Sequence, residues 1–203
     1  MNGDWYTWSG TNNGGENTSD FGDPTRPDGP ERFVAAYQHI HDIFDAEGAE
    51  NVLWVWCPNI AMEGDLGADW NAIANYYPGA DYVDWLCMDG YNWGASQEWS
   101  SWQTFDEVFS ETYAQLQALD PGKPIMIGET ASTEEGGDKA IWIKDAAARL
   151  PSAYPQVRLL VWFNLDKETD WRINSSPASL EAFQQVLKQY TWGQIPWPGL
   201  EQP

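Results

Sequence analysis

Basic residues are scarce in this chain of 203 residues: 10 Lys and Arg stand against 31 Asp and Glu, so the formal net charge is -21. A surface this acidic repels phosphate groups, and nucleic acid and anionic membranes are therefore poor candidate partners. The sequence also lacks an apolar run of the roughly 18 residues that a membrane-spanning helix needs. We predict no nucleic-acid partner and no membrane contact.

Cysteine is almost absent as well. Cys57 and Cys87 are too few for a disulfide framework, and both lie in apolar runs, so we predict free, buried thiols. No spacing of His and Cys typical of a zinc site is present, so we predict neither a metal nor a cofactor. The first residues, Met1 to Trp5, do not resemble a signal peptide.

Tryptophan, in contrast, is abundant, with 14 residues, and 42% of the chain is hydrophobic. This composition is typical of a folded domain in spite of the charge. Trp side chains near loops offer flat apolar surfaces, which suit the faces of sugar rings. The alternative is ordinary packing, which we expect for roughly half of them.

Nearly continuous apolar runs alternate with segments of helical periodicity, which indicates a parallel sheet covered by helices. Residues 1–30 and 192–203 are predicted to be irregular, and Asp138 is predicted to cap a helix. The predicted strands are 51–57, 82–88, 124–128 and 157–163, and the predicted helices are 30–47, 69–77, 106–119, 138–150 and 178–190.

Two α/β architectures fit this pattern. One is a small doubly wound sheet, although no Gly-rich phosphate loop follows any predicted strand. The other is part of a (β/α)8 TIM barrel, of which the chain would supply about the last four β-α units. Four strands would leave two open edges, so we also expect self-association through those edges.

Polar side chains follow the predicted strands, at the edge where the active site of a parallel barrel lies. Glu129 comes directly after 124–128, and alternation predicts its side chain on the same face as Ile125 and Ile127. A carboxylate there can act as a nucleophile or carry a proton. Tyr91 and Trp162 end neighbouring strands, so we expect both to reach Glu129, with rim packing as the alternative for Tyr91.

Several segments, in order, resemble glycoside hydrolase family 26, the β-mannanase family. The segments are Met1–Trp8, Asn51–Asn59, Tyr76–Gly79, Val83–Trp85, Asp89–Gly94, Lys123–Glu129 and Gly136–Lys139. The resemblance implies a (β/α)8 barrel with retaining, double-displacement chemistry. We therefore expect residues 1–191 to form the C-terminal half of such a catalytic domain.

The resemblance also implies roles for single residues. Glu129 matches the nucleophile and Tyr91 the tyrosine that orients it. Trp162 matches the aromatic floor of the subsite that holds the reacting sugar, and Trp5 matches an aromatic wall. The further candidates for substrate binding are Asn2, Trp56, Asp89 and Trp93.

The family's acid/base Glu would immediately precede Met1, and the chain does not contain it. We therefore expect a truncated retaining endo-β-glycosidase, secreted as the full-length protein. Its expected substrate partner is a polysaccharide: β-1,4-mannan, with mixed-linkage β-glucan or β-1,3-xylan as alternatives. The other hypotheses are a non-catalytic carbohydrate-binding half-barrel and an inactive fragment.

Overall fold

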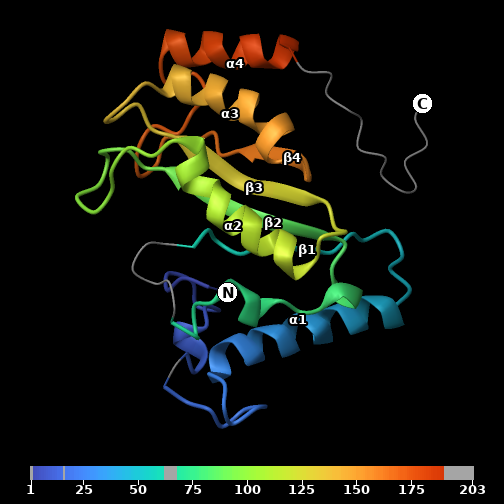
Figure 1. Cartoon of the computed structure of the whole chain (residues 1–203). Coiled ribbons are helices and arrows are strands. Elements are labelled where there is room, and N and C mark those ends of the chain that lie inside the picture. Colours follow the sequence, from blue (N-terminus) through green and yellow to red (C-terminus); the bar gives the residue numbers. More distant parts are fainter. Residues whose placement is uncertain (1, 16, 62–67, 190–203) are drawn as a thin grey trace.

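The computed structural model describes residues 2–15, 17–61 and 68–189. The irregular tail predicted for 192–203 lies outside these residues. Within them, the strands form one parallel sheet in the order β1-β2-β3-β4 (Figure 1). The strands are β1 (Val55–Trp56), β2 (Trp85–Asn92), β3 (Ile125–Ser132) and β4 (Val157–Trp162). Strands that follow one another in chain order without a reversal are expected of a barrel segment, and not of a doubly wound sheet.

The helices confirm the predicted alternation. They are α1 (Asp28–Ala46), α2 (Phe105–Leu119), α3 (Lys139–Ala153) and α4 (Pro177–Gln189), and the short 3-10 turns are η1 (Thr11–Asn13), η2 (Ile73–Tyr76) and η3 (Ala80–Tyr82). Asp138 caps α3 as predicted, because its side chain accepts a hydrogen bond from the N–H of Ile141.

Two predicted elements are shorter than expected. The helix predicted for 69–77 is only η2, and the chain turns away at Pro78 and Gly79. The strand predicted for 51–57 is only β1. Its first part does not continue the ladder because the Asp84 carboxylate accepts the Trp54 N–H at 2.7 Å, and the Trp54 carbonyl accepts the N–H groups of Asp84 and Trp85.

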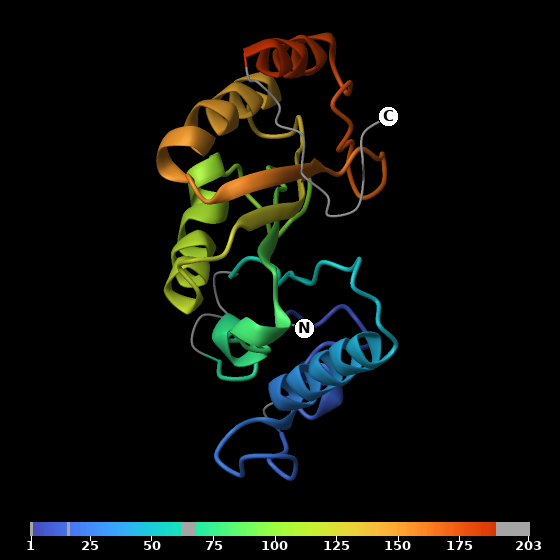
Figure 2. The ribbon, with the colours of Figure 1, turned by 90° about the vertical axis from the view of Figure 1, so that its right-hand side faces the viewer.

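The core lies between the sheet and the helices that cover one of its faces. Figure 2 shows α2 and α3 on the same side of the strands. The core residues from the strands include Leu86, Met88, Ile125 and Ile127, and those from the helices include Phe105, Phe109 and Trp142. The opposite face of the strands carries Cys87, Asp89 and Tyr91, which alternate with the core residues of β2.

Candidate active site

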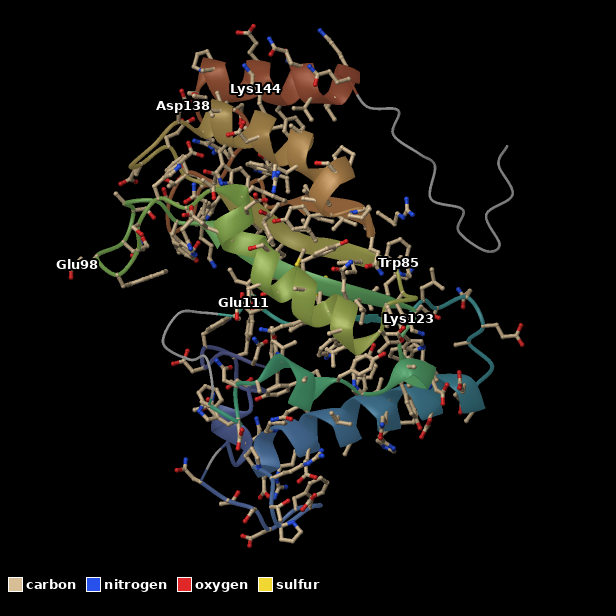
Figure 3. The ribbon with its side chains drawn as sticks, viewed as in Figure 1. Trp85, Glu98, Glu111, Lys123, Asp138 and Lys144 are labelled. Carbon is tan, nitrogen blue, oxygen red and sulfur yellow. A yellow bond between two sulfur atoms is a disulfide. The ribbon has the colours of Figure 1, made fainter. Side chains whose placement is uncertain are left out.

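Glu129 and Tyr91 meet at the C-terminal edge of the sheet. The Tyr91 hydroxyl donates a hydrogen bond to Oε2 of Glu129 at 2.7 Å. In Figure 3 the label of Glu98, in the loop after β2, marks this edge, and the labels of Trp85 and Lys123 mark the opposite edge. The predicted pair is therefore brought together where barrel enzymes have their active sites.

The prediction of the face on which Glu129 lies was wrong. Ile125 and Ile127 are fully buried in the core, whereas Glu129 is exposed and reaches Tyr91. Simple alternation fails because the pairing register shifts between Met88 and Asp89, and again after Ile127. Such a bulge changes the direction of the following side chains, and here it turns Glu129 away from the helices.

Asp89 is the register partner of Glu129 on β2. Burial, followed by repulsion from Glu129, raises the pKa of the Asp89 carboxyl to about 7, although a backbone hydrogen bond from Glu129 opposes the shift. The Asp89 carboxyl can therefore carry a proton near neutral pH. Asp89 is only partly accessible, so its predicted contact with substrate stays a prediction.

A disulfide bond lies directly beside Asp89. Cys57 and Cys87 are bonded to each other, so the prediction of free thiols was wrong. The pairing of Trp56 with Leu86 in the sheet brings the next residue of each strand, the two cysteines, side by side. Oδ1 of Asp89 lies 3.1 Å from Sγ of Cys57.

Gly128 passes close to this disulfide, and a Cβ at that position would lie 2.5 Å from Sγ of Cys87. A glycine is required at this close approach, because any larger residue would displace the disulfide or the strand. The absence of a side chain at Gly128 thus allows β3 to pass close to both sulfurs, directly before Glu129.

Within the described residues, one group of three side chains is close enough to share a metal ion: Cys57, Cys87 and Asp89. The disulfide engages both sulfurs, and thiolates are the form of cysteine that binds metals. The residues of this cluster therefore do not fit a metal site while the disulfide is intact.

Burial raises the pKa of Tyr91, and its hydrogen bond to Glu129 raises it further. The Tyr91 hydroxyl therefore stays protonated and remains a donor across the neutral range. A donor fixed on Oε2 leaves Oε1 of Glu129 as the oxygen that is available to an incoming group.

Aromatic rings extend from Tyr91 to the surface. The Tyr91 ring lies 5.0 Å from Trp171, which in turn lies 4.8 Å from Trp93, and Trp93 lies 5.2 Å from Trp99. Trp171 is 1% exposed and Trp99 is 64% exposed. We call Tyr91, Trp171, Trp93 and Trp99 the aromatic row. The predicted residue Trp93 lies within this row, with its ring 6.1 Å from that of Tyr91.

Sequence reasoning missed Trp171 and chose Trp162 in its place. Trp162 packs on the helix-covered face, with its ring 6.1 Å from Trp142 of α3 and 5.9 Å from Phe183 of α4. Its indole N–H donates to the Trp171 carbonyl at 2.8 Å. The role expected of Trp162 as a sugar-binding floor is therefore wrong, since its ring faces the helices. The available indication was the aromatic-polar run Asp170–Arg172 in the loop after β4.

Trp56 and Asn2 also differ from expectation. Trp56 is 1% exposed and packs on Tyr77 in the core, out of reach of a polysaccharide. The Asn2 side chain is buried. Its Nδ2 donates to the Asn59 carbonyl and its Oδ1 accepts from the Asn59 N–H, so Asn2 anchors the N-terminal segment beside the end of β1. Neither residue is retained as a substrate-binding candidate.

The predicted residue Trp5 remains accessible. It is 52% exposed and has Tyr6 beside it, and Tyr6 stacks on Trp8 with ring centroids 4.5 Å apart. In the described part of the chain, no helix has the length and apolar character needed to cross a membrane.

Comparisons with known proteins bear on this site. The model of Glycosyl hydrolase family 26 matches residues 1–155. Endoglucanase H of Acetivibrio thermocellus is 44% identical over 187 residues, which are 92% of this chain and 19% of that protein. Mannan endo-1,4-beta-mannosidase A and B of Caldalkalibacillus mannanilyticus is 30% identical over 93 residues, which are 45% of this chain and 15% of that protein.

Solved structures support the fold. Bacillus subtilis mannanase BCman superposes with a TM-score of 0.51 at 24% identity, over 88% of this chain and 41% of that chain. The endo-beta-mannanase/endo-beta-glucanase of Prevotella bryantii gives 0.50 at 18% identity, over 86% and 22% of the two chains. The sequence thus spans about a fifth or less of the length of the curated relatives, and its fold is a partial (β/α)8 barrel.

Proposed function

We propose, since the chain belongs to glycosyl hydrolase family 26, that it carries the nucleophile of a retaining endo-β-glycosidase. The observation that carries this proposal is the 2.7 Å hydrogen bond from Tyr91 to Glu129 at the C-terminal edge of the parallel sheet. Residues 1–191 would form the C-terminal part of the catalytic domain.

In this mechanism Oε1 of Glu129 attacks the anomeric carbon, and the bond to the leaving oxygen breaks as the glycosyl–enzyme bond forms. Tyr91 holds Oε2 and so fixes the carboxylate in one orientation. Retention needs a second carboxyl group about 5–5.5 Å away, which protonates the leaving oxygen and later activates water. The family resemblance assigns that role to a Glu that would immediately precede Met1.

We propose β-1,4-mannan or a related neutral plant cell-wall polysaccharide as the substrate. The names of the relatives point to mannan and glucan, and the aromatic row offers apolar faces to such chains. The net charge of -21 supports a neutral polysaccharide, because an acidic polysaccharide would be repelled. The choice between mannan and β-glucan is left to experiment.

The test is covalent trapping of the nucleophile. We would incubate the chain with 2,4-dinitrophenyl 2-deoxy-2-fluoro-β-mannoside and, separately, with the β-glucoside, and measure the intact mass. Dinitrophenolate leaves without protonation, so the first step does not depend on the acid/base group. We expect one added fluoroglycosyl group, mapped to Glu129 by peptide sequencing.

The controls are Glu129→Gln, which should not be labelled, and Glu135→Gln, which changes an exposed Glu in the loop after β3 and should be labelled normally. Labelling at another carboxyl group, or no labelling by either reagent, would contradict the nucleophile assignment. The sugar that labels faster indicates the substrate class.

A second candidate function is carbohydrate binding without catalysis, which the exposed rings of Trp5 and Trp99 favour. Affinity electrophoresis in mannan or β-glucan gels tests it. Retarded migration without labelling of Glu129 would support this second function over the first.

Secretion of the full-length protein and self-association through the sheet edges also remain proposals. The second rests on β1 and β4, which are the outer strands of the sheet in the described part of the chain. Sedimentation velocity over a hundredfold range of concentration would detect association, and a constant monomer mass would contradict it.

A further inference from the structure

Lys139 is the most deeply buried cation of the described chain. It is the first residue of α3 and has 0% of its surface exposed. Its Nζ donates to the carbonyl of Asp170 at 3.1 Å, to the carbonyl of Arg172 at 2.8 Å and to the Ser175 hydroxyl at 2.9 Å. An ammonium group has three N–H donors, so all of them are used, and all are directed to one segment.

That segment, residues 170–175, carries Trp171. The carbonyls on either side of Trp171 accept from Lys139, and the carbonyl of Trp171 itself accepts from the Trp162 indole. Three successive carbonyls therefore accept hydrogen bonds from Lys139, which is buried, and from Trp162, which is partly buried. The side chain between them packs on Tyr91, with ring centroids 5.0 Å apart.

A hydrogen-bonded serine connects the positive charge of Lys139 to a carboxylate. The Ser175 hydroxyl that accepts from Nζ donates in turn to Oε1 of Glu134 at 2.8 Å. Burial lowers the pKa of Lys139 to about 8, and the charges of Glu134 and Asp170 oppose this effect. Burying a charge that is bound by neutral oxygens costs desolvation free energy, so a gain in stability does not by itself explain a lysine at this position.

We propose that Lys139 is a positioning residue for the nucleophile: by fixing residues 170–175 it presses Trp171 against Tyr91, and so holds the hydroxyl that orients Glu129. The order of contacts is Lys139, then Trp171, then Tyr91, then Glu129. Lys139 and Trp171 are buried, Tyr91 is partly buried, and only Glu129 at the end of the series is exposed. This inference rests on the proposed role of Glu129 as the nucleophile.

The test compares Lys139→Met with Lys144→Met in the trapping reaction. Both lysines lie on α3, but Lys144 is exposed (Figure 3) and makes none of these contacts. Because small displacements of reacting groups reduce rates strongly, we expect Lys139→Met to lower the maximal rate of labelling by about tenfold or more. Lys144→Met should label at the rate of the unmodified chain.

A loss of stability alone must be separated from a loss of positioning. Ala146→Gly, seven residues after Lys139 on a buried turn of the same helix, provides a variant destabilised by about 1 kcal/mol. It should keep its labelling rate. If Lys139→Met does not fold, Ser175→Ala takes its place, since it removes one acceptor and breaks the link to Glu134.

Hydrogen–deuterium exchange of the peptide containing 165–176 provides a readout that does not depend on catalysis. We expect faster exchange in Lys139→Met or Ser175→Ala than in Lys144→Met. A folded variant with unchanged exchange and unchanged labelling would overturn the proposal. Faster exchange with an unchanged labelling rate would also overturn it, because the segment would then not position Glu129. If the unmodified chain is not labelled at all, the proposed function fails, and the inference about catalytic positioning fails with it.

Discussion

The Tyr91 hydroxyl and Oε2 of Glu129 are joined by a 2.7 Å hydrogen bond that links β2 to β3 at the C-terminal edge of the sheet. The two residues are 38 positions apart in the chain and are not register partners, since Tyr91 pairs with Ala131 and Glu129 with Asp89. The long phenol side chain crosses this offset. The proposed nucleophile thus accepts its hydrogen bond from a group that lies further along the neighbouring strand.

Tyr91→Phe should slow the trapping of Glu129 by about a hundredfold, because removal of one preorganised donor to a charged group at the reaction centre costs this order of rate. The ring and its packing on Trp171 are kept, so the melting temperature should change little. The measurement is the first-order rate of labelling by intact mass.

Tyr77→Phe is the matched control, because it removes a similar hydrogen bond, from Tyr77 to Oδ2 of Asp120, outside the site. An equal rate for Tyr91→Phe and the unmodified chain would mean that the bond does not orient the nucleophile.

Asp89→Asn should flatten the pH dependence of stability between about pH 4 and pH 7. The pKa of Asp89 rises from 3.8 to about 7 on folding, so the folded protein binds this proton more tightly than the unfolded chain. The resulting stability is fully present below the unfolded pKa and is lost as the pH rises through 7. Each pKa unit corresponds to about 1.4 kcal/mol, so a loss of a few kcal/mol is expected in the unmodified chain.

Urea unfolding at pH 4, 5.5 and 8 measures this effect. The exposed Asp145 provides the control through Asp145→Asn, which should keep the slope of the unmodified chain. A slope in Asp89→Asn equal to that of the unmodified chain would show that Asp89 does not titrate in this range.

Much of the fold could be predicted because parallel strands buried on both faces are nearly continuous apolar runs, as in Leu86–Met88 and Ile125–Ile127. The contact between the Tyr91 and Glu129 side chains could be predicted because the carboxyl ends of parallel strands meet at one edge of the sheet. These features depend on local composition and on a general rule of topology, and both are accessible from one sequence.

The remaining features depend on register, which composition does not contain. The bulge between Met88 and Asp89 reverses the face expected for Glu129, and no sequence pattern marks it. The disulfide requires Cys57 to lie beside Cys87, which is known only once Trp56 pairs with Leu86. Trp171 reaches Tyr91 from a loop, where neither strand nor helix periodicity predicts a direction.

The Cys57–Cys87 disulfide should stabilise the domain measurably. It closes a segment of 30 residues, and the loss of such a bond typically costs about 2–4 kcal/mol. The double variant Cys57→Ala, Cys87→Ala should therefore melt at a lower temperature than the oxidised chain, and addition of reductant should lower the melting temperature of the unmodified chain only. Alkylation in denaturant without reductant should add no mass, whereas two alkylated thiols would contradict the bond.

Trp99→Ala should weaken the binding of long oligosaccharides more than that of short ones. Trp99 ends the aromatic row at the surface, with its ring 5.2 Å from Trp93 and 64% of its surface exposed. A sugar stacked on one ring face buries apolar area worth on the order of 1 kcal/mol, or about fivefold in Kd. The measurement is titration calorimetry with mannobiose and mannohexaose, and with the corresponding β-glucan oligosaccharides. Phe44→Ala removes an exposed aromatic ring on α1 and should leave both affinities unchanged. An equal loss for the short and the long ligand would place Trp99 next to Glu129 instead of at a distal subsite, and no loss for either would remove it from the binding surface.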